Sequence, residues 1–313
     1  MSSLESFEKQ NDLFQDDSRA GRPAEHLKHV PDSLTRASLR MEFPPSYILV
    51  GIYRLFTDTS VYKPAWDKCK HGARRGAIVG LVWVVLTFSL QEKFIQVFLR
   101  NSPRITGLSN DNIFGVPIPF PLHTYAAILY VSQQVTFILR FFLSKNIRIA
   151  RDRAWQHTVE SRGKGPEFWE PYVEEWEVPP QVDVKEGFLE KAMGGWLGLF
   201  VFKRVLLAPL SLYPLVGTLA SAWFKALGTS RYLHRRYFEA KKMDKQQVAV
   251  FMEERKWDYR SFGFVAALLE GLPIIGLVFT VSNRIGAAMW AFDLEKKQHF
   301  VADQKRLRLE KKN

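Results

Sequence analysis

The sequence predicts an all-α polytopic membrane protein, with two transmembrane helices and two Pro/Gly-broken helical hairpins joined by long cytosolic amphipathic helices. Three observations lead to this fold class. Apolar residues make up 47% of the 313-residue chain and gather in three blocks instead of spreading evenly. Lys and Arg cluster in the segments that flank these blocks, as they do on the cytosolic side of membrane proteins. Two of the blocks contain a Pro-x-x-Gly sequence, which kinks or reverses a helix.

The amino-terminal part divides into an arm and an amphipathic segment. Residues 1–45 mix charges with Ser and Pro without sustained periodicity, which is typical of a disordered polar arm. Residues 46–76 combine an apolar stripe with a basic flank. Two interpretations stay open for them: a helix lying on a membrane surface, or a helix packed against the rest of the protein. The stripe consists of Tyr47, Val50, Ile52 and Phe56.

Residues 77–143 are predicted to form a pair of transmembrane helices. The run from Leu122 to Leu139 is uncharged and about as long as a tilted span requires. The run that begins at Ala77 reaches that length only if its helix continues through Glu92 and Lys93 towards Leu99. The sequence between the two runs is rich in Pro, Gly and Asn, so it predicts a loop.

The distribution of basic residues predicts the orientation of this pair. One basic cluster precedes the first span and another follows the second, so both ends of the pair are expected in the cytosol. The clusters consist of Lys68, Lys70, Arg74 and Arg75, and of Lys145, Arg148, Arg151 and Arg153.

The connector 144–195 carries an acidic-aromatic segment, PEFWEPYVEEWEVPP. Its large apolar residues are spaced as on one face of a helix. We expect this face to pack against its own protein; the alternative is a docking segment for a basic partner. The face consists of Trp169, Tyr172, Val173 and Trp176.

The second and third apolar blocks, residues 196–228 and 261–293, are predicted to be membrane hairpins. Their apices are P-L-V-G and P-I-I-G, since Pro removes a backbone donor and Gly permits a reversal. The basic helix 229–260 between them and the basic tail 294–313 both stay cytosolic if each block crosses an even number of times. The apical residues are Pro214, Gly217, Pro273 and Gly276.

Polar residues inside these hairpins form a candidate intramembrane polar site. If the apices stop near the middle of the bilayer, the two cations lie at the cytosolic interface and the protein is a scaffold. If the hairpins cross fully, the cations lie in mid-membrane, where they require a polar cavity such as an anion pathway. We favour the shallow arrangement. The site consists of Lys225, Glu270, Asn283 and Arg284.

The segment RYFEAKKM, the later run FMEERKWDYRSFGFVAALLEGLPIIGLVFTVSNRIGAAMWAFDLEKK and the upstream PLVG resemble a fungal multi-pass family. It includes outer-spore-wall and lipid-droplet sporulation proteins and proteins named transmembrane protein UsgS. The resemblance covers roughly residues 46–298, is most specific from Arg260 to Asp293, and extends distantly to the etoposide-induced and CysZ-like families. The spore-wall relatives imply an endomembrane or lipid-droplet protein without known catalysis, and the CysZ relatives imply sulfate permeation.

We therefore expect an integral protein of the endoplasmic reticulum or lipid droplets, with both termini cytosolic and a structural or organising role linked to fungal sporulation. The alternative is a sulfate-like anion channel or transporter. The expected partner is a bilayer or droplet monolayer with anionic headgroups, because the formal net charge is +12. Self-association into a homo-oligomer stays open. Nucleic acid is not expected as a partner, since no nucleic-acid module is recognised.

No enzymatic activity, cofactor, metal site or catalytic residue is predicted. The histidines show no metal-ligand spacing, and Cys69 is the single cysteine, so an intrachain disulfide is excluded. The segment from His234 to Glu239 has the spacing of an acyltransferase His-x4-Asp motif, but with Glu and without an accompanying motif. An acyltransferase function is therefore not predicted.

Overall fold

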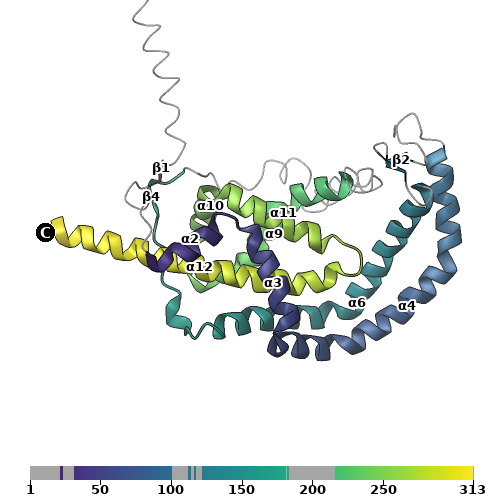
Figure 1. Cartoon of the computed structure of the whole chain (residues 1–313), viewed down its shortest axis with the longest axis horizontal. Coiled ribbons are helices and arrows are strands. Elements are labelled where there is room, and N and C mark those ends of the chain that lie inside the picture. The colour runs from purple at the N-terminus through teal and green to yellow at the C-terminus, as the bar shows by residue number, and fades with distance from the viewer. Residues whose placement is uncertain are drawn as a thin grey trace, which may run out of the picture.

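The computed structural model describes residues 22–23, 32–100, 112–113, 116–117, 122–180, 182 and 216–312. These residues form an all-α fold of eight α-helices with two short antiparallel strand pairs (Figure 1). The helices are α2 (Asp32–Met41), α3 (Pro45–Thr57), α4 (Thr59–Arg100), α6 (Leu122–Glu160), α9 (Val216–Ala240), α10 (Lys245–Glu254), α11 (Lys256–Glu270) and α12 (Gly276–Lys312). The strand pairs are β1 (Arg22–Pro23) with β4 (Trp176–Val178), and β2 (Asn112–Ile113) with β3 (Val116–Pro117).

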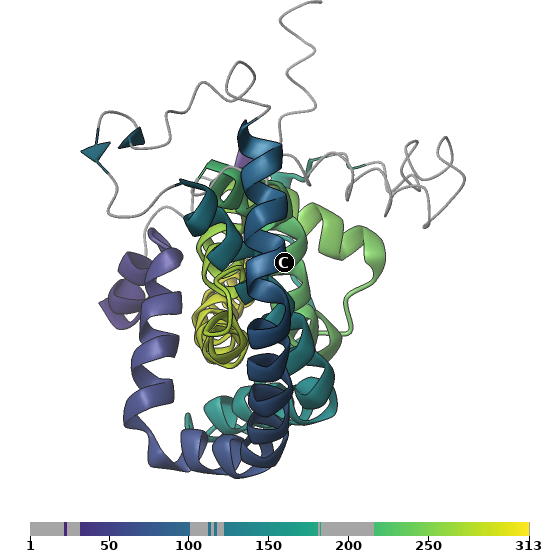
Figure 2. The ribbon, with the colours of Figure 1, turned by 90° about the vertical axis from the view of Figure 1, so that its right-hand side faces the viewer.

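Helix α12 is the centre of the molecule. Every residue from 281 to 295 is buried, because α3, α6, α9 and α11 all pack against this helix. Figure 2 shows α12 nearly end-on, with α3 on one side and the helices of the carboxyl-terminal half on the other. The stretch 281–295 is buried on every side although it includes the charged residues Arg284, Asp293 and Glu295. Here other helices of the chain cover it.

Two glycines let α3 approach α12 closely. A Cβ atom on Gly51 would lie 2.3 Å from the carbonyl oxygen of Ser282, and one on Gly286 would lie 2.5 Å from the carbonyl oxygen of Tyr47. Both obstacles are backbone atoms, so no side chain could move aside. The α3–α12 contact therefore depends on glycine at both positions.

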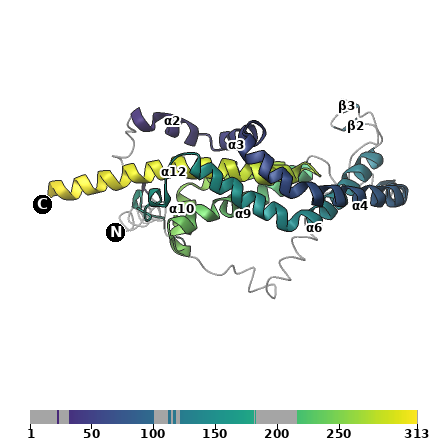
Figure 3. The same ribbon diagram turned by 90° about the horizontal axis from the view of Figure 1, so that it is seen from below.

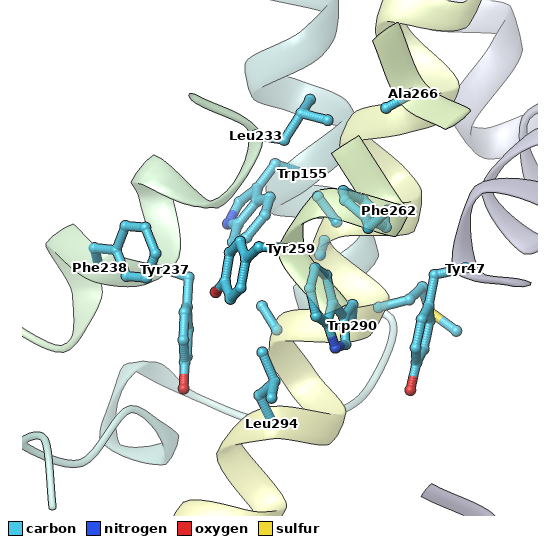
Figure 4. Packing of buried hydrophobic residues seen from close by; sticks show 14 of the residues in the cluster. Tyr47, Trp155, Leu233, Tyr237, Phe238, Tyr259, Phe262, Ala266, Trp290 and Leu294 are labelled. Carbon is cyan, nitrogen blue, oxygen red and sulfur yellow. The ribbon is translucent and has the colours of Figure 1, made fainter. Parts of the chain in front are cut away.

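Aromatic side chains fill the core around Trp290 (Figure 4). The ring of Trp290 lies 4.7 Å from that of Phe262, 4.8 Å from that of Tyr259 and 6.3 Å from that of Tyr47, centroid to centroid. These rings come from α11, α3 and α12, so the cluster joins segments that are far apart in the sequence. Offset and tilted ring pairs of this kind add to the stabilisation from area burial.

Helices α4 and α6 form a long antiparallel pair that curves around one end of this core and extends beyond it (Figures 1 and 3). Helix α4 continues through Glu92 and Lys93 to Arg100, as the length argument required. The predicted boundaries at residues 76 and 143 are not breaks in the chain, because each lies inside one continuous helix. The basic flanks thus extend the same helices that carry the apolar runs.

The acidic-aromatic segment is not helical. It forms a 3-10 turn at Pro166–Phe168 and then an extended strand, β4, so the predicted helical face does not exist. Pro171, Pro179 and Pro180 restrict the backbone here, and this outweighs the helix-like spacing of the aromatics. The segment does pack against its own protein, as expected: Trp169 contacts Tyr237, and Tyr172 contacts Phe251. We call residues 166–178 the strap.

The third apolar block consists of two helices joined by a turn, since α11 ends at Glu270 and α12 begins at Gly276. Helix α12 continues without interruption past residue 293, so the predicted tail is the second half of the same helix. In the second block, Pro214 lies outside the described residues, and Gly217 is buried in the first turn of α9. Helix α9 continues through the boundary predicted at residue 228 because no helix breaker follows Gly228.

Candidate functional site

The α4–α6 pair presents apolar side chains to its surroundings. Both helices are long and apolar enough to cross a membrane, yet only 11% of the most apolar part of α4 and 33% of that of α6 is buried. The outward side chains Val85, Leu86, Leu90 and Phe94 are 72–74% exposed. Contiguous exposed apolar surface of this extent is rare on soluble monomers and is typical of contact with lipid or with a partner.

Several uncharged polar side chains of the apolar part of the pair, and Glu92, lie between its two helices. The indole Nε1 of Trp83 donates to Oε1 of Gln134 at 2.6 Å, and Gln134 exchanges hydrogen bonds of 2.9 and 3.1 Å with Gln91. Nearer the tip, the hydroxyl of Thr124 donates to Oε1 of Glu92 at 2.8 Å. We call these contacts the polar clamp. The pair is therefore inverted relative to a soluble helical hairpin, with polar groups inside and apolar groups outside.

Three glycines of α4 face α6 at intervals of four residues. A Cβ on Gly76 would lie 3.0 Å from Cδ2 of Leu139, and one on Gly80 would lie 3.0 Å from Cγ1 of Val135. One on Gly72 would lie 2.9 Å from the carbonyl oxygen of Phe142. Small residues at this spacing let two membrane helices pack backbone to backbone. The sequence reasoning missed this feature, although the G-x-x-x-G-x-x-x-G pattern in GARRGAIVG was a readable signal.

The turn between α11 and α12 lies against the side of α6. The backbone N–H of Ile274 donates to the Thr136 hydroxyl at 2.8 Å, and Gln133 donates to the carbonyl oxygen of Gly271 at 3.4 Å. The turn is therefore level with residues 133–136 of α6. Since Arg140 is four to seven residues further along the helix, the turn lies about 6 to 10 Å beyond it. Three side chains near the turn are exposed: Ile274, Ile275 and Val278.

The predicted polar site is brought together only in part. Nδ2 of Asn283 donates to Oε1 of Glu270 at 3.0 Å and to the carbonyl oxygen of Ala266 at 3.1 Å. Arg284 is buried and donates to the carbonyl oxygens of Tyr232 and Leu233 at 3.0 and 2.8 Å. Lys225 lies exposed on α9. The two predicted cations thus occupy different environments, and Arg284 holds α12 to α9.

His234 is an internal side chain of the core. It is fully buried, with Nδ1 2.8 Å from the Tyr259 hydroxyl and Nε2 3.1 Å from the carbonyl oxygen of Ala287. Burial lowers the pKa of His234 to about 3, so the imidazole is neutral at physiological pH. Glu239 lies on the solvent side of α9, where it pairs with Arg235. The two ends of the acyltransferase-like spacing therefore do not share a site.

A buried ion pair joins the turn that follows α9 to helix α12. The ammonium of Lys241 lies 2.8 Å from Oε2 of Glu295, and both side chains are 0% exposed. Lys241 also donates to the carbonyl oxygen of Glu170 at 2.8 Å. The backbone N–H of Glu170 in turn donates to Oε1 of Glu295 at 2.9 Å. The pair therefore anchors the strap over the core. No sequence pattern indicated that these two residues would meet.

Similarity to known proteins is limited to one part of the chain. No protein-family profile and no solved structure matches it. A stretch of 88 residues is 40% identical to the outer spore wall protein RRT8 of Saccharomyces cerevisiae. That stretch covers 28% of this chain and 25% of the yeast protein. The chain is therefore similar, over about a quarter of its length, to an outer spore wall protein.

Proposed function

We propose that this chain is an integral membrane protein of the endoplasmic reticulum or lipid droplets with a structural or organising role. In this proposal the α4–α6 pair enters the lipid and the helices around α12 form a body at the cytosolic face. One observation carries the proposal: the pair is apolar outside and polar inside, whereas the body is packed as a soluble domain is. This inversion is what a lipid environment favours.

The level of the α11–α12 turn supports a shallow position for the third block. The turn lies about 6 to 10 Å beyond Arg140, which closes the uncharged run of α6. If Arg140 lies among the headgroups, the turn dips just below them, and Arg284, two helical turns back along α12, lies outside the lipid. In this arrangement two helices cross, the remaining blocks dock at the cytosolic surface, and both termini are cytosolic.

The lipid partner follows from the basic residues at the base of the pair. Exposed Lys68, Lys70, Arg74 and Arg75 on α4, together with Lys145 and Arg148 on α6, favour anionic headgroups. The partial similarity to an outer spore wall protein supports a role in fungal spore formation. We propose no catalytic step for this protein.

Paired Lys substitutions test the membrane insertion. Leu86→Lys with Leu90→Lys places two charges on the outward face of α4, each costing about 2.5 to 3.5 kcal/mol at the centre of a bilayer. We expect the variant to lose resistance to alkaline carbonate extraction of membranes. The matched control is Trp257→Lys with Leu309→Lys, which changes equally exposed apolar residues on the body. If all variants resist extraction equally, the proposed insertion of α4 is wrong.

The anion-pathway alternative is tested by flux. Purified protein in liposomes should give no sulfate or chloride flux above that of empty liposomes. Anion flux that the wild type shows and Lys225→Ala loses would indicate a channel in place of the organising role. Arg284→Lys, which keeps the positive charge, is the control for folding. Deletion of the gene in its host, scored by the resistance of the spore wall to lytic enzymes, tests the link to sporulation separately.

A further inference from the structure

A cavity of about 360 Å³ lies within the body, between α2, the strap, α10, α11 and α12. Figure 1 shows these elements gathered at the end of the molecule opposite the α4–α6 tip. The volume is within the range of sites that hold small organic ligands. One wall is apolar and consists of Leu34, Met41, Trp290, Leu294, Phe300 and Val301.

The other end of the cavity is charged, with more acids than bases. Four carboxyl groups and two cationic side chains line it: Glu42, Glu175, Glu254, Asp258, Arg255 and Lys297. Arg255 and Lys297 both form ion pairs with Glu175, and the ammonium of Lys297 lies 3.1 Å from Oε2 of Glu175. Within the described part of the chain, Asp258 forms no ion pair, and burial raises the pKa of its carboxyl group. The cavity is thus acidic, although the chain as a whole is strongly basic.

Glu254 supplies a buried carboxyl group to the lining of this cavity. Its side chain is 0% exposed; one oxygen accepts from Arg255 at 2.8 Å, whereas Oε1 accepts no hydrogen bond. Its neighbour is the carboxyl group of Glu174 on the strap, which accepts from the Tyr172 hydroxyl and from the backbone N–H of Trp176. Two adjacent carboxyl groups require a proton or a cation between them. Burial and Glu174 raise the pKa of Glu254 to about 8, so a proton fills this role in the empty cavity.

The arrangement suits an organic cation better than a metal ion. Among the described residues, no group of three or more His, Cys, Asp or Glu side chains is placed to hold a metal. An ammonium group donates hydrogen bonds to separate acceptors, and its carbon body can cover the wall around Trp290. We propose that this cavity binds a hydrophobic ammonium compound, with its head between Glu254 and Asp258 and its apolar body against Trp290 and Leu294.

Calorimetric titration of the purified full-length protein in detergent micelles tests this site, with 2-phenylethylammonium as the probe. We expect saturable binding that Asp258→Asn and Glu254→Gln each weaken about tenfold or more, because a charged hydrogen bond is lost. Binding at pH 7 should also release a proton from Glu254, so the apparent heat should change between buffers of different ionisation enthalpy. Glu253→Gln is the matched control, since Glu253 lies on the same helix but is exposed.

Neutral 2-phenylethanol and anionic phenylacetate should not bind. The proposal is overturned if either binds as tightly as the amine, if the amine does not bind, or if both cavity variants retain wild-type affinity while melting as the wild type does. Dodecylammonium supplied in phosphatidylcholine nanodiscs distinguishes the source of the ligand. Tighter binding of that probe assigns the site to a membrane amphiphile, and tighter binding of 2-phenylethylammonium assigns it to a soluble amine.

Discussion

The α4–α6 pair and the body around α12 use the same types of side chain in opposite ways. In the body, Trp290 and its aromatic neighbours are inside, and the charged groups that are buried with them, such as Lys241 and Glu295, are paired. In the pair, Leu86 and Leu90 face outward, and neutral amides meet between the helices. Burial therefore does not follow hydropathy in this chain, because the more apolar α4 is largely exposed, whereas residues 281–295 of α12 are enclosed by protein.

The largest expected effect is on the buried ion pair of the body. Glu295→Ala leaves the ammonium of Lys241 buried without its partner, which should destabilise the body by about 3 to 5 kcal/mol. The double variant Lys241→Met with Glu295→Leu should lose much less, since no charge remains buried. Urea unfolding followed by tryptophan fluorescence measures both. A double variant as unstable as Glu295→Ala would mean that the pair itself, and not an orphaned charge, stabilises the body.

The same Gly→Ala substitution should have unequal effects in the two regions. A Cβ on Gly263 would lie 1.9 Å from the carbonyl oxygen of Ala226, so α9 and α11 must separate, which costs about 1 to 3 kcal/mol or more. At Gly80 the obstacle is the side chain of Val135, which can rotate, so we expect less than about 1 kcal/mol. Thermal unfolding in micelles compares the two variants. Equal destabilisation would indicate that α4 and α6 pack as rigidly as the body.

The stability of the body should depend on pH through Glu254. The folded-state pKa of Glu254 is raised to about 8, above its unfolded value, so the stability it contributes is present at low pH and lost as pH rises through 8. Between pH 7 and pH 9 the body should lose about 1 kcal/mol, and Glu254→Gln should remove this loss. The pKa of Glu175 is lowered to about 2, because Arg255 and Lys297 outweigh the effect of its burial, so Glu175 stays ionised throughout this range. Chemical unfolding at several pH values provides the measurement.

The smallest expected effect concerns the polar clamp. Gln134→Leu removes the hydrogen bonds to Trp83 and Gln91, which should weaken the α4–α6 contact by about 0.6 to 1.7 kcal/mol in lipid, independently of pH. Gln133→Leu is the control, because Gln133 contacts the α11–α12 turn and not α4. Crosslinking between cysteines placed across the pair reports the loss of contact. An increase in contact would show that the amides are not needed to hold the helices together.

The all-α class and the turn between Glu270 and Gly276 could be predicted from the sequence, and α4 meets the condition that its length as a span required, because it continues through Glu92 and Lys93. Each depends on local chemistry: apolar runs of sufficient length, and a Pro and Gly that stop a helix where they occur. The packing of the strap against the rest of the chain was also predicted. The prediction that the strap is helical was wrong, because its prolines restrict the backbone to an extended conformation.

The packing of the helices sets which of them is covered and which is exposed. Residues 77–97 are more apolar than residues 281–295, which include Arg284, Asp293 and Glu295, yet α12 is surrounded by four helices and α4 mainly by one. The partners of Arg284, Lys241 and Glu254 could not be predicted from the sequence either, because each contact joins residues far apart in the chain. A side chain of given polarity is stable inside or outside according to what surrounds it, and those surroundings exist only once the helices have packed.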